Sequence, residues 1–183
     1  DVDLSSQNIT PESICSVITE NTKAIVCVHL AGWPCDMDEI IAVANENNLY
    51  VIEDAAHAPM AQYSNEHNKF FSVGSCKHST AATISFHAIK HVTTGEGGVL
   101  LTNDSEIADR AKKLRSHGIV KDACEFLKEP SGSWYYEQQS LGFNYRITDI
   151  QASLGLSQLK RLEEIINVRN RQLNFYREIL DEL

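Results

Sequence analysis

The stretch LYVIED (residues 49–54) is an almost wholly apolar run that ends in two carboxylates. Continuous apolar runs of this length are typical of strands buried on both faces of a parallel sheet. Runs of similar character are KAIVCVHL (23–30), AATISF (81–86) and GGVLLTN (97–103). These runs predict the strands of one buried sheet.

Amphipathic helices are expected between the runs. Thr10-Pro11-Glu12 places an N-cap, a proline and an acid at the start of a short helix over residues 11–20. Asp36 with Glu39 is close to a capping box, and the helix that follows should end at Asn47-Asn48. Residues 62–80 are polar and rich in turn formers, so no element is expected there.

Two further helices are expected in the second half of the chain. One should begin near Asp104 and stop at His117-Gly118. Residues 119–140 show no regular period, and a second capping box, Thr148 to Gln151, then opens one long amphipathic helix that continues to Leu183. Strands that alternate with helices predict an α/β fold, a mainly parallel sheet with helices on both faces.

Composition and charge exclude several classes of protein. The chain has 183 residues, 43% hydrophobic and 22% charged, with a net charge of −9, so neither a nucleic-acid partner nor an anionic membrane surface is expected. No run is long enough to span a membrane, and the polar start lacks a signal-peptide pattern, which favours a cytoplasmic protein. The chain begins without Met and ends inside a helical pattern, so we expect a piece of a longer protein.

The cysteines and histidines do not indicate a metal site. Five scattered cysteines without a C-x-x-C pair favour reduced, buried thiols. His87 and His91 are four residues apart, but they lie in an expected turn and lack a third ligand nearby. No metal is therefore expected.

Lys90 and Asp54 are the strongest candidates for chemistry. Ligands of parallel α/β sheets collect at the carboxyl ends of the strands, where Asp54 ends one run and Lys90 follows another. A desolvated lysine can form an imine with a carbonyl, and a rigid aspartate can keep a pyridine nitrogen protonated. The alternatives are a solvated Lys90 and an Asp54 that caps a helix over AAHAPMAQ.

Neighbouring residues extend this candidate site. His57 could share the side of Asp54, although a structural histidine is nearly as reasonable, whereas Glu53 should point to the opposite face of its strand. Ser85 and the turn TTGEGG offer hydroxyls and backbone amides for a phosphate, or merely a tight turn between strands.

Four motifs together resemble the sugar aminotransferases of the DegT/DnrJ/EryC1/StrS family. They are VIEDAAHA (51–58), SFHAIKHVTTGEGG (85–98), LRSHGI (114–119) and GFNYRITDIQASLGLSQL (142–159). The resemblance implies the fold-type I aminotransferase architecture. Residues 1–147 would form part of the large domain that binds pyridoxal phosphate, and residues 148–183 would form a helix leading toward a C-terminal small domain that this sequence does not include.

The resemblance also implies roles for individual residues. Lys90 resembles the lysine that binds the cofactor as a Schiff base and moves the proton. Asp54 resembles the partner of the pyridine nitrogen, His57 the residue beside the phenolic oxygen, and Ser85 a phosphate ligand. Asn144 resembles the asparagine that reaches the cofactor phosphate of the other subunit, which implies a homodimer with shared sites.

The activity implied is a transfer of an amino group from an amino acid, glutamate, to a keto group on a nucleotide-linked deoxysugar. Members with the closest motifs act on UDP-linked amino sugars in polysaccharide synthesis. Two alternatives stay open, a sugar dehydratase of the same family, which carries histidine in place of lysine, and a non-catalytic α/β relative in which Lys90 is merely exposed.

Overall fold

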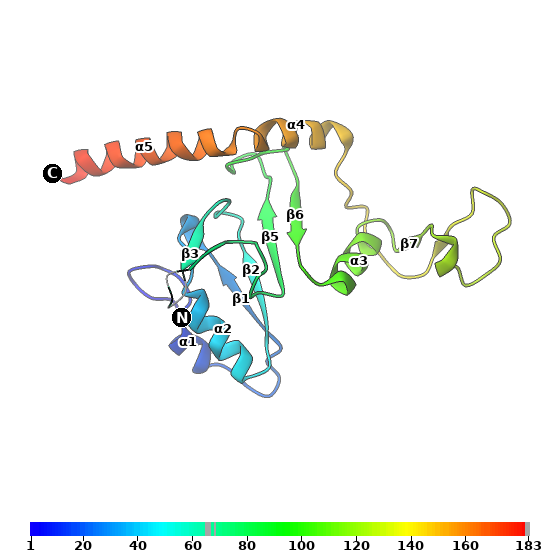
Figure 1. The fold of residues 1–183 in the computed structure, drawn as a ribbon, viewed down its shortest axis with the longest axis horizontal. Coiled ribbons are helices and arrows are strands. Elements are labelled where there is room, and N and C mark those ends of the chain that lie inside the picture. The colour runs from blue at the N-terminus through cyan, green and yellow to red at the C-terminus, as the bar shows by residue number, and fades with distance from the viewer. Residues whose placement is uncertain (65–66, 68, 182–183) are drawn as a thin grey trace.

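A central sheet organises the protein, for which a computed structural model describes residues 1–64, 67 and 69–181. The sheet has four strands in the order β1-β2-β5-β6 (Figure 1). Strands β1 (Ala24–Val28), β2 (Tyr50–Asp54) and β5 (Ala81–Ser85) are parallel, whereas β6 (Gly98–Leu101) is antiparallel to β5. The expected α/β class and mainly parallel sheet are confirmed.

The helices follow the expected order along the chain. They are α1 (Pro11–Cys15), α2 (Met37–Glu46), α3 (Ser105–Leu114), α4 (Asp149–Leu159) and α5 (Leu162–Asp181). Short 3-10 turns, η1 (Leu30–Gly32) and η2 (Ala123–Glu125), complete them.

Two details of the first helices differ from expectation. The helix expected over residues 11–20 ends at Cys15. A tighter turn follows, in which the amide of Val17 donates to the carbonyl of Ile14, three residues back, and the hydroxyl of Ser16 donates to Ser13 O at 2.8 Å. Asp36 is the N-cap of α2, but its side chain makes no capping hydrogen bond, so the capping box predicted with Glu39 is wrong.

The long helix expected from Thr148 is divided in two. Its capping box is confirmed, since the Thr148 hydroxyl and the Gln151 side chain bond reciprocally to backbone amides. The helix then breaks at residues 160–161, where the Arg161 amide donates to Gln158 O at 3.0 Å, three residues back instead of four. Leu183, the expected last position, lies outside the described residues.

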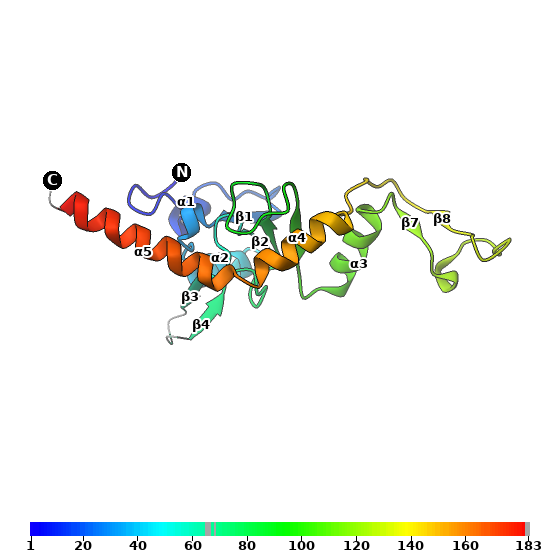
Figure 2. The same ribbon diagram turned by 90° about the horizontal axis from the view of Figure 1, so that it is seen from above.

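Two small antiparallel pairs lie outside the central sheet. Strands β3 (Gln62–Ser64) and β4 (Phe70–Ser72) form a hairpin in the region where no element was expected. Strands β7 (Ile119–Val120) and β8 (Glu137–Gln138) form the second pair. Residues 119–143 extend away from the sheet (Figures 1 and 2), and we call this segment the arm.

The core lies on one face of the sheet. Inward residues of β1 and β2, namely Ile25, Cys27 and Val51, pack with Ile14 of α1 and Met37, Ile40 and Ala44 of α2. The outward residues Val26 and Tyr50 are 55% and 63% exposed. The expectation of helices on both faces is therefore not met within the described residues, because α4 and α5 cross the end of the sheet instead (Figure 1).

A buried polar network fixes strand β2 within this core. Glu53 and His29 are both fully buried, and their side chains are joined by a contact of 3.2 Å between Nε2 and Oε2. The amide of Gly74 donates to the same carboxylate at 3.2 Å, and the Ser79 hydroxyl also donates to it. Glu53 thus points away from the face of Asp54, as predicted, whereas the role of His29 was not predicted.

This network keeps Glu53 ionised. Burial favours the neutral acid, but the hydrogen bonds from His29, Ser79 and Gly74 outweigh it and lower the pKa of Glu53. A carboxyl whose pKa is lowered by folding stabilises the protein above its unfolded pKa, and this stabilisation is lost as the pH falls through the folded pKa.

None of the described helices is both long and apolar enough to cross a bilayer.

The five cysteines are free thiols. Cys27, Cys35 and Cys76 are buried, but Cys15 and Cys124 are exposed, which corrects the expectation that all are buried.

We expect Glu53→Gln to lower the free energy of unfolding by roughly 2–3 kcal/mol at neutral pH, because His29, Ser79 and Gly74 lose their anionic partner. Denaturant unfolding across pH would measure this. The difference from the wild type should shrink below about pH 4, near the pKa of an unfolded glutamate. Glu20→Gln, at an exposed site, is the control; a pH-independent difference for Glu53→Gln would contradict the assignment.

Candidate active site

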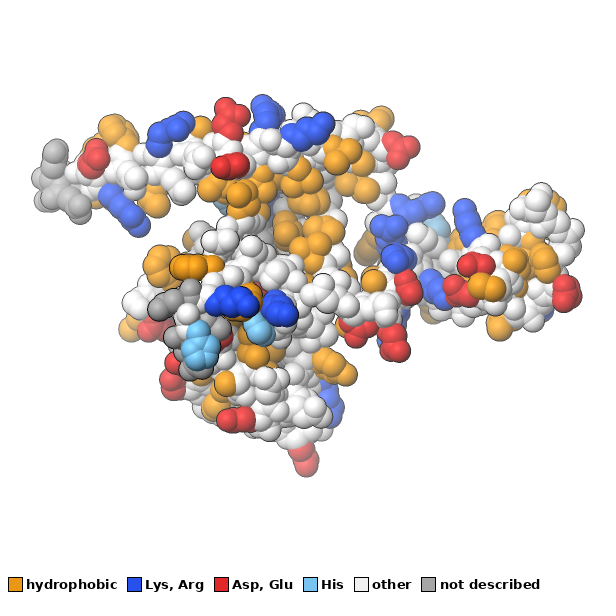
Figure 3. All heavy atoms as spheres, in the orientation of Figure 1, with side chains coloured by type: hydrophobic (Ala, Val, Ile, Leu, Met, Phe, Trp, Pro, Cys, Tyr) orange, Lys and Arg blue, Asp and Glu red, His pale blue; other side chains and the backbone are white. Residues whose placement is uncertain are grey.

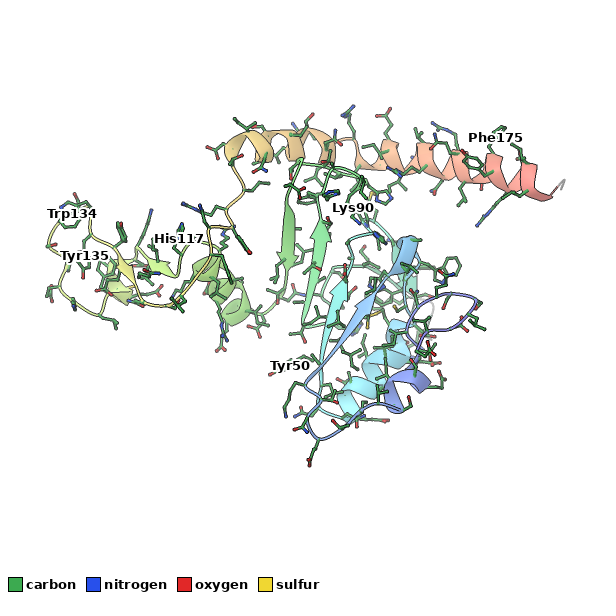
Figure 4. The ribbon with its side chains drawn as sticks, turned by 180° about the vertical axis from the view of Figure 1, so that it is seen from behind. Tyr50, Lys90, His117, Trp134, Tyr135 and Phe175 are labelled. Carbon is green, nitrogen blue, oxygen red and sulfur yellow. The ribbon has the colours of Figure 1, made fainter. Side chains whose placement is uncertain are left out.

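The carboxyl ends of β2 and β5 form one edge of the sheet. The two strands are parallel neighbours with Asp54 paired to Thr83, so Asp54 and Ser85 end at the same edge. The turn from β5 to β6 carries Lys90 beyond this edge, under the helix pair α4 and α5, while Tyr50 marks the opposite end of the sheet (Figure 4). The predicted proximity of the Asp54 and Lys90 segments follows from this topology.

Asp54 is half-buried and rigidly anchored. Its carbonyl accepts from the amide of His29 at 3.1 Å, and the next amide, Ala55, donates to Thr83 O at 2.9 Å. Its Oδ1 accepts from the amide of Ala56 at 3.0 Å, while Oδ2 has no hydrogen-bond partner among the described residues. No helix follows, so the alternative role of Asp54 as a helix cap is wrong, and one carboxylate oxygen is available to a ligand.

His57 is held by a close approach of the loop after β1. Its Nδ1 accepts from the amide of Ala31 at 3.4 Å. Gly32 has φ +87°, and a Cβ there would stand 3.1 Å from His57 O. A side chain at this position would be strained, which accounts for the glycine.

Basic groups gather around Lys90, which is half-buried. Burial lowers the pKa of His91, and the nearby charges of Arg169, His57 and Lys90 lower it further. Nδ1 of His91 is buried without a hydrogen-bond partner in the described part of the chain. The edge therefore combines positive charge with an unused polar atom, which suits an anionic ligand.

The hydroxyls expected to bind phosphate have local roles in the turn. Ser85 Oγ accepts from the amide of His87 at 3.3 Å, which leaves its own proton available. Thr93 Oγ1 donates to Phe86 O at 3.3 Å, and Thr94 Oγ1 donates to Glu96 O at 2.8 Å. Thr93 and Thr94 thus shape the turn, as the alternative interpretation held, and Ser85 remains the hydroxyl free to donate.

Helix α4 packs directly on this turn. Gln151 Nε2 donates to Glu96 O at 3.0 Å. Gly155 is buried, and a Cβ there would stand 2.8 Å from Cγ2 of Thr94. This contact was not predicted, although a glycine inside an amphipathic helix signals a close approach.

Asn144 lies elsewhere in the molecule. It is exposed and pairs with Ser116 in an isolated bridge, beside the hydrogen bond from His117 N to Phe143 O of 2.9 Å. His117 and Lys90 are well separated in Figure 4. The chain therefore brings Asp54, His57, Ser85 and Lys90 to one end of the sheet, but not Asn144.

His87 and His91, which were considered as a pair of metal ligands, have different neighbours. His87 Nε2 lies 3.6 Å from Glu96 Oε1, whereas His91 faces the basic groups. Within residues 1–64, 67 and 69–181, no cluster of three or more His, Cys, Asp or Glu side chains could hold a metal ion.

We expect Gly155→Ala to lower the free energy of unfolding by about 1–3 kcal/mol, because the added methyl group displaces α4 from Thr94. A loss of stability is informative, because replacing glycine by alanine inside a helix normally raises the free energy of unfolding by about 1 kcal/mol. Thr94→Ser, which removes Cγ2 but keeps the hydroxyl bound to Glu96 O, should recover most of the loss in the double variant. Ser153→Ala, exposed on α4, is the control; a more stable Gly155→Ala protein would contradict the contact.

Several known proteins are similar to this chain in sequence and in fold. A model of the DegT/DnrJ/EryC1/StrS aminotransferase family matches residues 1–183. GDP-perosamine synthase of Caulobacter vibrioides is 41% identical over 176 residues, which is 96% of this chain and 43% of that protein.

Solved structures agree. The X-ray structure of the aminotransferase from Psychrobacter cryohalolentis is 44% identical with a TM-score of 0.77, covering 90% of this chain and 40% of that one. DesI, whose structure was determined in the presence of its TDP-sugar product, is 32% identical with a TM-score of 0.76, covering 97% of this chain and 40% of that one. The chain spans less than half the length of these proteins. It belongs to the DegT/DnrJ/EryC1/StrS aminotransferase family.

Proposed function

We propose that the protein to which this chain belongs is a pyridoxal-phosphate-dependent aminotransferase. It would move an amino group from an amino acid, glutamate, to a keto group of a nucleotide-linked deoxysugar. The observation that carries the proposal is the arrival of Lys90 and Asp54 at one edge of a parallel sheet, from adjacent strands, in a chain of an aminotransferase family.

The residues at this edge fit the cofactor. A pyridine nitrogen needs an acid partner, and Asp54 has an unbonded carboxylate oxygen on a fixed strand end. A phosphate needs positive charge and donors, which Arg169, the Ser85 hydroxyl and the unused His91 Nδ1 would supply. When bound, pyridoxal phosphate supplies a carbonyl for amino transfer and a ring that withdraws electrons.

The chain's own residues would then have separate tasks. Asp54 would hold a proton on the ring nitrogen and orient the ring. Lys90 Nζ would act as the nucleophile and move a proton at the reacting carbon. His57 would lie beside the ring oxygen. A lysine at position 90 favours transamination over the dehydratase alternative, because dehydratases of the family carry histidine there.

The substrate class rests on the relatives. GDP-perosamine synthase is named for a nucleotide-linked sugar, and the structure of DesI was determined in the presence of its TDP-sugar product, so a similar substrate is proposed for this protein. We also propose a homodimer with shared sites, because Asn144 is exposed and lies beside His117, which Figure 4 shows well away from Lys90 of the same chain.

We expect Lys90→Ala to abolish the absorbance band at about 420 nm that the full-length protein should show after reconstitution with pyridoxal phosphate. Amino transfer from glutamate should be lost with it. Lys23→Ala, which changes a lysine just before β1 at the opposite edge, should retain both. A colourless wild-type protein would favour the non-catalytic relative, and a product without nitrogen from labelled glutamate would favour the dehydratase.

Shared sites predict complementation between two inactive variants. Lys90→Ala and Asn144→Ala proteins, unfolded together and refolded as a mixture, should regain about a quarter of wild-type activity, because one mixed site in each heterodimer is intact. Activity assays across mixing ratios would measure this. Activity that never rises above that of the separate variants would show that each site uses residues of one chain.

A further inference from the structure

Cys27 and Cys35 form a pair of thiols that the proposed mechanism does not use. Cys27 lies on β1, and Cys35 directly precedes Asp36, the N-cap of α2. Both belong to the core, with exposed fractions of 0% and 3%. Their side chains share a hydrogen bond, and Cys35 Sγ also lies 3.3 Å from Val28 O, the carbonyl of the residue after Cys27. Two thiols in contact are the arrangement from which a disulfide can form.

One of the two thiols is open to small molecules. A pocket of about 540 Å³ lies between residues 3–12, the start of α2 and strand β3, and its lining includes Cys35, Met37 and Tyr63. Cys27 is not among the lining residues in the part of the chain that the structure describes. A reagent that enters this pocket, which we call the Cys35 pocket, therefore meets Cys35 before it meets Cys27.

The two thiols also differ in acidity. The hydrogen bond with Cys27 lowers the pKa of Cys35 to about 6, against burial, which raises it, and His29 lowers it further. The same hydrogen bond raises the pKa of Cys27, and burial adds to that effect. Cys35 therefore ionises near neutral pH, whereas Cys27 keeps its proton. Because the thiolate is the nucleophile, acidity and access agree that Cys35 is the reactive member of the pair.

The charge around the Cys35 pocket discriminates between oxidants. Neither lysine nor arginine lines the pocket within the described residues, and Figure 3 shows acidic side chains on the surface around α1 and α2. Such a field repels an anionic oxidant, for example glutathione disulfide, and admits an uncharged one, for example hydrogen peroxide. The carboxylates that line the pocket are Asp3, Glu12, Asp36 and Glu39.

We propose that Cys35 is a peroxide-reactive thiol and that Cys27 resolves it to a disulfide. In the first step Cys35 Sγ attacks one oxygen of hydrogen peroxide. The S–O bond forms, the O–O bond breaks, and the departing hydroxide takes up the proton that the Cys35 thiol gave up. Cys27 Sγ then attacks the sulfur of the sulfenic acid, so that the S–S bond forms as the S–O bond breaks, and the second hydroxide leaves as water with the proton of Cys27. The two thiols are oxidised to one disulfide, and the peroxide is reduced to two waters.

The proposed bridge would close a loop that contacts the candidate site. Residues 28–34 lie between the two cysteines, and the amide of Ala31 in this loop donates to His57 Nδ1 at 3.4 Å. His29, in the same loop, contacts Glu53. The bridge would therefore form one hydrogen bond away from His57.

The test is peptide mapping by mass spectrometry of the full-length protein after treatment with hydrogen peroxide. The peptide that holds Cys27 and Cys35 should lose two hydrogen atoms and regain them with dithiothreitol. In Cys27→Ala, labelling of Cys35 by dimedone should rise about tenfold over the wild type, because no second thiol removes the sulfenic acid. Cys76→Ala, which removes a buried thiol that donates to Leu101 O at 3.2 Å, should leave the bridge unchanged.

Several results would overturn the proposal. One is a peroxide-treated wild type in which the exposed Cys15 and Cys124 are oxidised while the peptide that holds Cys27 and Cys35 keeps its mass. Another is an absence of dimedone on Cys35 in both Cys27→Ala and Cys27→Val, when both variants keep the circular dichroism of the wild type. If neither variant folds, the wild-type peptide decides alone, since it needs no substitution.

Glutathione disulfide at the same concentration tests the role of charge. It should modify the exposed Cys15 and Cys124 and leave Cys35 free. Attachment of glutathione to Cys35 in preference to the exposed thiols would reject the assignment of an uncharged oxidant to the Cys35 pocket.

Discussion

The burial of Glu53 is the constraint on which the candidate site depends. Neighbouring residues of a strand project to opposite faces, so fixing one side chain fixes the other. Glu53 is bound by His29, Ser79 and Gly74 from three other segments of the chain, which holds β2 in one register. A shift of one residue would place Asp54 in the core and an ionised Glu53 on the open face. The network therefore determines which of the two carboxylates faces the candidate site.

The second constraint acts on the turn that carries Lys90. Its backbone is closed by hydrogen bonds from Phe86 N to Gly97 O and from Thr94 N to Phe86 O, at 2.8 and 2.9 Å. Helix α4 then rests on the same turn through Gly155 and Gln151. If Lys90 binds the cofactor as proposed, it must be held in place, which a freely moving loop could not do. Gly155 would then help to position Lys90, even though it lies 65 residues further along the chain.

The sequence predicts local features well and contacts between distant segments poorly. The apolar runs predict β1, β2, β5 and β6, and alternation predicts that Glu53 and Asp54 point to opposite faces. Nothing in the sequence pairs His29 with Glu53, because 24 residues separate them and either could bind another partner. Likewise the apolar pattern continues through residues 160–161, where the backbone breaks the helix. The expectation of a sheet covered on both faces arises from outward residues such as Val26 and Tyr50, which no described helix covers.

The distribution of charged residues in the chain bears on the proposed function. An acidic protein repels anionic ligands on average, so phosphate recognition must come from places where basic groups outnumber their partners. One such place is the Lys90 edge, where Arg169 lies near His91. Asn144 lies elsewhere in the chain, in a bridge with Ser116 beside His117. A site that used both Lys90 and Asn144 would therefore need Asn144 from a second subunit, as the proposed homodimer has it. Such a contact also requires side chains near Asn144 that are open in the isolated chain, and Trp134 and Tyr145 are 71% and 73% exposed.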